Sequence, residues 1–129
     1  MIDFQQNIDK YANEVYLYCM TIIIIRTKEY SRFISWLPIG TEIDKAEEEI
    51  ARNPDKWPVI KGTGGIRKAR FAIGNKGKRG GGRIWYFYFI QKEEVYLLRA
   101  YLKNEKEDLT ATDKSILKQS VRDLTNEKS

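Results

Sequence analysis

Two strongly β-prone runs in the second half of the chain constrain the fold more than any other feature. Residues 83–90 (RIWYFYFI) and 95–102 (VYLLRAYL) are rich in aromatic and aliphatic side chains, and only the four residues 91–94 separate them. Runs of this length and composition are typical of strands, and so short a connection predicts an antiparallel pair. Any fold of this chain is therefore expected to contain a sheet built on this pair.

The segments around this pair complete an α+β pattern. Residues 21–27 (TIIIIRT) predict a buried strand, and residues 66–72 predict a further one. Apolar residues at helical spacing predict three helices, over residues 28–36 and 42–52 and from Thr110 onward. The resulting order is β-α-α-β-β-β-α. We therefore predict an α+β fold with an antiparallel-dominated sheet of about four strands, two N-terminal helices and a C-terminal helix.

The N-terminal residues fit this pattern poorly. The chain has 129 residues, which suits one domain, but residues 1–19 are polar and only weakly periodic. One interpretation is that residues 1–19 are an extension outside the native domain, which would then begin near Met20 and span residues 20–126. The other is a short helix from Ile8 to Tyr18 that packs on the domain.

The composition excludes several classes of site. The chain has no His and one cysteine, Cys19, so neither a Ser-His-Asp or Cys-His centre nor a His or Cys-cluster metal site can form. We expect no metal, no cofactor, and a reducing, cytoplasmic setting. The longest apolar stretch, Val15 to Ile25, falls short of the ~20 residues of a membrane-spanning helix. An enzyme built from this chain must use Lys, Arg, Tyr, Asp or Glu.

Positive charge is concentrated in one part of the chain. Residues 61–106 hold twelve basic and three acidic side chains, a net charge of +9, whereas the whole chain carries +5. Aromatic residues are interleaved with these cations. Because bases stack on aromatic rings while cations hold phosphates, this block predicts a nucleic-acid interface. A merely solvated basic surface is the alternative. The acidic triplet 47–49 is interpreted as a solvated helix face.

The glycine clusters do not match a nucleotide-binding loop. The Gly77-Lys78-Arg79 segment lacks the Ser or Thr and the spacing of a P-loop. The Gly62-Thr63-Gly64-Gly65 segment lacks the helices that surround the loop of a KH domain. We expect Gly64-Gly65 to bend the chain before a strand, and residues 80–82 to form a flexible hairpin tip.

Several cations are expected to meet on one face of the sheet. Lys68 and Arg70 are two residues apart on a strand, so their side chains share a face, and the hairpin can place Arg83 beside them. Further basic residues on or after the last strand, and tyrosines that can stack or transfer protons, are Arg99, Lys103, Lys106, Tyr88, Tyr96 and Tyr101. RNA supplies its own nucleophile, the 2′-OH, and clustered cations can meet two needs of its cleavage, because they stabilise phosphate charge and lower the pKa of a neighbouring Lys so that it can accept a proton. Composition alone does not separate such an enzyme from a passive RNA-binding sheet.

Three segments carry a resemblance to a known family. Residues 62–70 (GTGGIRKAR), 80–86 (GGGRIWY) and 96–109 (YLLRAYLKNEKEDL) resemble the RelE/HigB-type toxins of type II toxin–antitoxin modules. The likeness is greatest to the HigB branch of the RelE/ParE superfamily and covers about residues 20–126. It implies a small α+β mRNA interferase, a metal-independent endoribonuclease that cuts mRNA, usually on the ribosome, and so inhibits translation. It also implies neutralisation by a cognate helix-turn-helix antitoxin of the HigA type.

The resemblance also assigns site residues. The catalytic candidates are Lys68, Arg70, Arg83 and Lys103, with the arginines stabilising phosphate and Lys68 or Lys103 transferring a proton. The RNA-binding candidates are Arg67, Lys76, Lys78, Arg79, Lys106 and Tyr101. The proton donor to the leaving group is unassigned, because Thr110, which is better explained as a helix N-cap, lies where some relatives carry a Tyr or His. The related ParE group shares this fold but inhibits gyrase, so fold alone does not decide the activity.

Overall fold

The computed structural model describes residues 12–18, 22–37, 42–73, 81–103 and 109–126. In chain order the elements are β1 (Ala12–Tyr18), β2 (Ile22–Thr27), α2 (Lys28–Ile34), α3 (Ile43–Arg52), β3 (Ile66–Phe71), β4 (Gly82–Phe89), the short 3-10 helix η2 (Ile90–Lys92), β5 (Glu94–Leu102) and α5 (Ala111–Asn126). The predicted α+β class and the order of elements from β2 onward are confirmed. Within the described ranges, no helix is both long enough and apolar enough to cross a bilayer.

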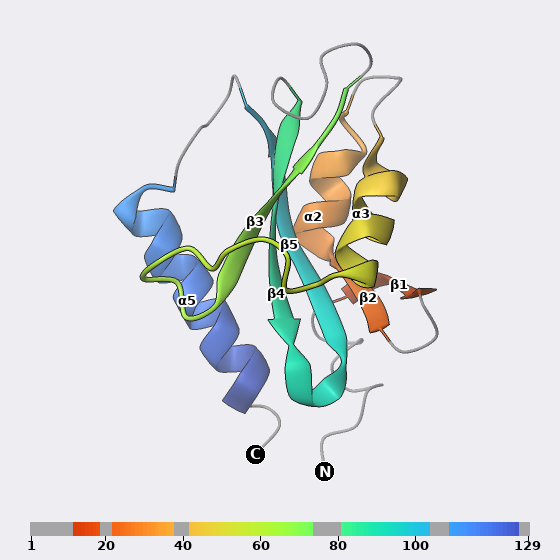
Figure 1. The fold of residues 1–129 in the computed structure, drawn as a ribbon. Coiled ribbons are helices and arrows are strands. Elements are labelled where there is room, and N and C mark those ends of the chain that lie inside the picture. The colour runs from red at the N-terminus through yellow and green to blue at the C-terminus, as the bar shows by residue number, and fades with distance from the viewer. Residues whose placement is uncertain (1–11, 19–21, 38–41, 74–80, 104–108, 127–129) are drawn as a thin grey trace.

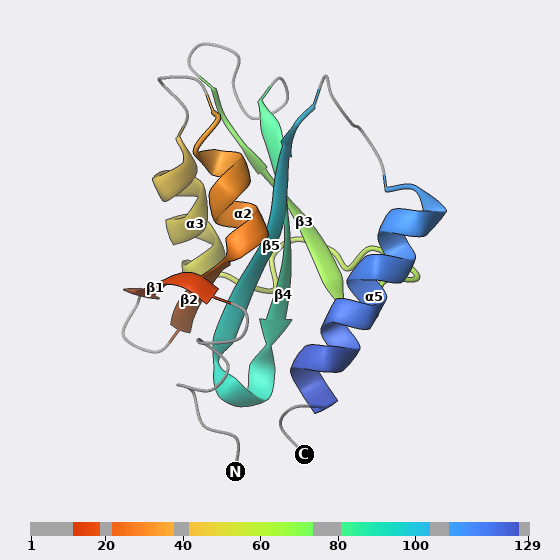
Figure 2. The ribbon, with the colours of Figure 1, turned by 180° about the vertical axis from the view of Figure 1, so that it is seen from behind.

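One mixed sheet divides the molecule into three layers. Its strand order is β1-β2-β5-β4-β3, with α5 on one face and with α2 and α3 on the other (Figures 1 and 2). The pair β2–β5 is parallel, and the other three pairs are antiparallel, as expected of an antiparallel-dominated sheet. The two β-prone runs form the central strands β4 and β5, since both are buried on both faces.

The sheet has one more strand than the sequence predicted. Residues 12–18 pair antiparallel with β2 along almost its whole length, so the helix considered for Ile8 to Tyr18 is wrong over these residues. The physical reason is that β2 would otherwise end the sheet with an unpaired edge, and the β-prone residues of ANEVYLY can supply its hydrogen bonds. The division into an extension of residues 1–19 and a domain of residues 20–126 stays a prediction.

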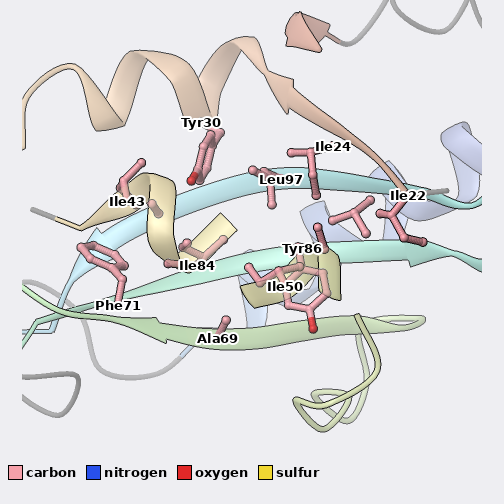
Figure 3. Packing of buried hydrophobic residues seen from close by; sticks show 14 residues of the cluster. Ile22, Ile24, Tyr30, Ile43, Ile50, Ala69, Phe71, Ile84, Tyr86 and Leu97 are labelled. Carbon is pink, nitrogen blue, oxygen red and sulfur yellow. The ribbon is translucent and has the colours of Figure 1, made fainter. Parts of the chain in front are cut away.

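Each face of the sheet has its own hydrophobic core. Beneath α2 and α3, the side chains of Tyr30, Ile43 and Ile50 face Ile84 and Leu97 of the central strands (Figure 3). On the opposite face, α5 buries three side chains at helical spacing against the sheet, namely Leu117, Val121 and Leu124. The two cores hold α2 and α5 on opposite faces of the sheet, and residues of both helices contact Arg99 of β5.

The prediction of a solvated acidic triplet is wrong for Glu47. Its side chain is fully buried and accepts hydrogen bonds from the Arg26 guanidinium at 2.8–3.1 Å and from the Tyr30 hydroxyl at 2.7 Å. Arg26, itself 8% exposed, also pairs with Asp44. Burial raises the pKa of Glu47 against the opposing effect of the Arg26 and Tyr30 hydrogen bonds, and burial also raises the pKa of Tyr30. This network ties α3 to β2 and α2.

The glycines have two different structural roles. Gly64 and Gly65 adopt φ angles of +80° and +124°, which confirms the predicted bend before β3. Gly82 instead lies inside the sheet, opposite Phe71 of β3 and Leu102 of β5, so its assignment to a flexible hairpin tip is wrong. The reason is close packing, because a Cβ added at Gly82 would lie 2.1 Å from Cζ of Phe71 and 2.6 Å from the carbonyl oxygen of Tyr101.

The substitution Gly82→Ala should therefore lower the free energy of unfolding by about 1–3 kcal/mol, the usual cost of overpacking. One of the two short contacts is to backbone, so a change of the Phe71 rotamer alone cannot relieve the strain. Urea denaturation followed by circular dichroism measures the loss. An unfolding free energy within about 0.5 kcal/mol of the native value, the range of ordinary surface substitutions, would contradict this packing.

Candidate functional site

The register of β3 and β4 brings the predicted catalytic cations together. Arg70 lies directly opposite Arg83, and Lys68 lies opposite Trp85. Residues opposite one another or two apart on paired strands share a face, so Lys68, Arg70, Arg83 and Trp85 leave the sheet on the side that α5 covers. The expectation that the hairpin places Arg83 beside Arg70 is confirmed.

A β-bulge in β5 adds two further residues to the same face. Trp85 pairs with Arg99 and the next residue, Tyr86, pairs with Leu97, so Leu98 is an extra residue in β5. If side chains alternated regularly along β5 through Leu98, Arg99 and Tyr101 would point toward α2 and α3, as Leu97 does. Because of the bulge, both instead join what we call the cationic face, which consists of Lys68, Arg70, Arg83, Trp85, Arg99 and Tyr101.

Contacts between their side chains hold three residues of the cationic face in fixed positions, namely Trp85, Arg99 and Tyr101. The Trp85 indole Nε1 donates to the Tyr101 hydroxyl oxygen at 3.2 Å, and the two rings meet edge to face at 4.8 Å. The Arg99 guanidinium lies 5.5 Å from the Trp85 ring centre, within cation–π range. Tyr101, predicted to bind RNA, is therefore held in place by Trp85, on which Arg99 also packs.

The members of the cationic face differ in exposure. Arg70 is exposed and Lys68 is half-buried, whereas Arg83 and Tyr101 are only 7% and 4% exposed. The Arg83 guanidinium donates to the carbonyl oxygen of Gly82 at 3.0 Å. The Arg70 guanidinium lies 5.9 Å from the Trp57 ring at the outer edge of β3. A polyanion can thus reach Arg70 and Lys68 directly and Arg83 only in part.

The remaining candidates fall into two groups. The backbone N–H of Lys103 donates to the carbonyl of Gly81 at 3.0 Å, so Lys103 leaves β5 beside the start of β4, two residues from Arg83. Its side chain is half-buried. Four predicted residues lie outside the described residues, namely Lys76, Lys78, Arg79 and Lys106.

Arg67 lies on the other face of the sheet. It is adjacent in sequence to Lys68 and therefore points to the opposite side, where its guanidinium donates to the carbonyl oxygens of Asp55 and Trp57 at 3.1 and 2.6 Å. Tyr86, opposite Arg67, donates its hydroxyl to the carbonyl of Pro54 at 2.7 Å, and burial raises its pKa. These contacts fix the segment that follows α3, which gives Arg67 a structural role.

The two other tyrosines considered for stacking or proton transfer pack in the two cores. Tyr88 packs against the core beneath α2 and α3. Tyr96 lies on the same side of the sheet as the cationic face but is fully buried in the core beneath α5, where its hydroxyl donates to the Glu94 carboxylate at 3.0 Å. Of the three tyrosines, Tyr101 is the one that belongs to the cationic face.

Two acidic side chains pair with Arg99, and neither of these ion pairs was predicted from the sequence. Glu29 of α2 accepts from Arg99 at 2.6 Å, and Asp113 of α5 accepts at 3.5 Å. Asp113 also forms a reciprocal pair of hydrogen bonds with Thr110, each about 3 Å long, which confirms Thr110 as the N-cap of α5. No local pattern could have identified the Arg99–Glu29 pair, because seventy residues separate its partners.

Two arginines of the cationic face lie directly opposite one another in the sheet. Like charges directly opposite on paired strands destabilise a sheet, and Arg70 and Arg83 are such a pair. An anion bound between them would reduce this repulsion.

No family model matches the chain. In the described part of the chain, no group of three or more cysteine and acidic side chains is placed to hold a metal ion.

Proposed function

We propose that this protein is the toxin of a type II toxin–antitoxin module, a RelE/HigB-like endoribonuclease that cleaves mRNA, in association with the ribosome, and thereby inhibits translation. Its partners in this proposal are mRNA, the ribosome and a helix-turn-helix antitoxin of the HigA type. The motif resemblance suggests the class, and the order of elements from β2 to α5 agrees with it. The observation that carries the proposal is the directly opposed pair Arg70–Arg83 with Lys68 on the same face.

The proposed reaction needs no group beyond protein and RNA. A base removes the proton of a ribose 2′-OH, and the resulting oxygen attacks the adjacent phosphorus in line with the bond to the 5′-oxygen. That bond breaks, a 2′,3′-cyclic phosphate forms, and the departing 5′-oxygen takes up a proton. Arg70 and Arg83 would stabilise the charge on the phosphoryl oxygens, a role suited to planar guanidinium groups. Lys68 or Lys103 would transfer protons.

The burial of Arg83 and Tyr101 favours a second candidate function. A cationic face with one arginine only 7% exposed suits a protein that binds RNA, the ribosome or its antitoxin without cutting. Such a protein would use Arg70 and Lys68 as phosphate contacts alone.

Mapping of transcript ends after induction tests the proposal. We expect new 5′ ends at discrete positions within coding sequences. These ends should fall at a fixed position within codons, because the proposed nuclease acts on translating ribosomes. Primer extension or sequencing of 5′ ends measures this. Reduced protein synthesis with intact messages would instead support the binding function, and DNA breaks with inhibited gyrase would support a ParE-like activity. Either result would overturn the nuclease.

A further inference from the structure

A cavity beside the cationic face has a composition that neither catalysis nor folding explains. It has a volume of about 430 Å³ and lies where α2 meets the outer edge of β5. In the described part of the chain, the pairing of β2 with this edge ends at Leu97, just before the residues that line the cavity. The lining residues are Glu29, Arg32, Phe33, Trp36, Arg99, Ala100 and Tyr101. Arg99 and Tyr101 belong to both the cavity and the cationic face, so the two surfaces are continuous.

The most unusual residue of the cavity is Trp36. Its side chain is 81% exposed, the largest value among the exposed large hydrophobic residues of the described chain, although the half-buried Phe33 beside it packs on both cores. An exposed tryptophan is costly in water and provides the strongest stacking surface among the side chains. This exposure indicates a planar ligand at the rim of the cavity.

The charges of the lining indicate which part of a nucleotide would enter. Arg99 is paired with Glu29 at 2.6 Å inside the cavity, and Arg32 supplies a further, exposed guanidinium. A carboxylate in the lining repels a phosphate, but carboxylate and guanidinium groups together match the donors and acceptors on the edge of a base. The lining therefore suits a neutral aromatic ring with polar edges.

We propose that this cavity is a nucleobase-binding subsite for single-stranded RNA, in which a base stacks on Trp36 and its edge faces Glu29 and Arg32. The inference rests on the proposed function, because the phosphates of the same strand would lie on the cationic face. Neighbouring strands are about 4.8 Å apart, so the cavity at the outer edge of β5 lies about 10 Å or more from Arg70 on β3. The base in the cavity would thus belong to a nucleotide that flanks the cleaved phosphate.

Binding of a non-cleavable RNA tests the subsite. The probe is a fluorescent single-stranded oligonucleotide with 2′-O-methyl groups, followed by anisotropy with the full chain. Trp36→Ala should weaken binding by at least about fivefold, the lower range for loss of one stacked base, and Trp36→Phe should restore much of the affinity. Ile90→Ala, which truncates another exposed apolar residue, is the matched control and should bind as the native protein does.

Two readouts separate stacking from a structural effect. A series of probes, each lacking the base at one position, should include one probe that binds the native protein more weakly than the complete oligonucleotide does. The Trp36→Ala variant should bind that probe and the complete oligonucleotide with equal affinity. Trp36→Ala should leave the salt dependence of binding unchanged, whereas Arg70→Gln should reduce the slope by about 0.7, the value for one lost phosphate contact on a single strand.

The outcomes for the subsite and for the nuclease are distinguishable. Equal affinities of native protein and Trp36→Ala, or equal base-removal profiles, would overturn the subsite while the nuclease stands. A change in sedimentation of the Trp36→Ala protein without a change in RNA affinity would also overturn it, by assigning the cavity to a protein contact. Base-specific loss with Trp36→Ala combined with intact transcripts would support the subsite and overturn the nuclease.

Discussion

Replacing Glu47 by alanine should lower the free energy of unfolding by about 3–5 kcal/mol, the usual cost of removing one partner of a buried ion pair. The Arg26 residue is 8% exposed, and its guanidinium donates three hydrogen bonds of 2.8–3.1 Å to the Glu47 carboxylate. Without Glu47, this charge stays buried with the solvent-exposed Asp44 carboxylate, 3.0 Å away, as its ion-pair partner, and the Tyr30 hydroxyl loses its acceptor. A loss of this size is a large share of the stability of a small domain.

Glu48→Ala is the matched control for this prediction. Glu48 lies on the next position of α3, is partly exposed and pairs with Arg52 one turn away, so its loss should cost about 0.5 kcal/mol or less. Urea denaturation of both variants gives the comparison. A Glu47→Ala variant within about 1 kcal/mol of the native protein would show that the buried network does not stabilise the fold.

Glu47→Gln extends the test to pH. Because the pKa of Glu47 is raised in the folded state, the folded protein keeps this proton in a pH range where the unfolded chain has released it. The contribution of this group to stability is therefore fully present below the unfolded pKa, and it is lost as the pH rises through the folded pKa. The Glu47→Gln variant should lack this part of the pH dependence. Unfolding free energies measured across the acidic range would show the difference.

Simultaneous replacement of Lys68 by methionine and Arg70 by glutamine should reduce the rate of RNA cleavage by about 10² or more, the usual effect of removing a group that stabilises transition-state charge. Both side chains belong to the cationic face and are accessible, so the double variant should fold normally. Arg83→Ala is a weaker test, since Arg83 is 7% exposed and its loss also disturbs packing.

Arg122→Gln provides the control, because Arg122 is an exposed cation on α5 and lies outside the cationic face. Growth after induction and mapping of transcript ends should show arrest and cleavage with the control and neither with the double variant. Circular dichroism and denaturation establish that the double variant is folded. Undiminished cleavage by a folded double variant would remove the assigned site.

The parts of the fold that local pattern determines were predictable. The strands β4 and β5 follow from two β-prone runs, and α5 follows from apolar residues at helical spacing behind a Thr-x-x-Asp cap. The pairing of Arg70 with Arg83 was predictable for the same reason, since a hairpin joins strands that are neighbours in sequence.

The features that sequence reasoning missed depend on distant contacts. Glu47 is buried because it packs on Arg26, which lies 21 residues earlier, near the end of β2. Arg99 and Tyr101 reach the cationic face because of the bulge at Leu98, and simple alternation along VYLLRAYL places them on the other side. The exposure of Trp36 was equally hidden, because helical spacing in residues 28–36 cannot show where the pairing of β2 with β5 ends.

The parallel pairing of β2 with β5 affects the order in which the molecule can fold. Helices α2 and α3, strands β3 and β4 and the short helix η2 lie between these partners, so the inner edge of β2 has no neighbour until residues 94–97 have been synthesised. Closing so long a loop is slow compared with forming the local β4–β5 hairpin. A nascent chain on the ribosome thus assembles its last cationic strand and completes its sheet at nearly the same moment.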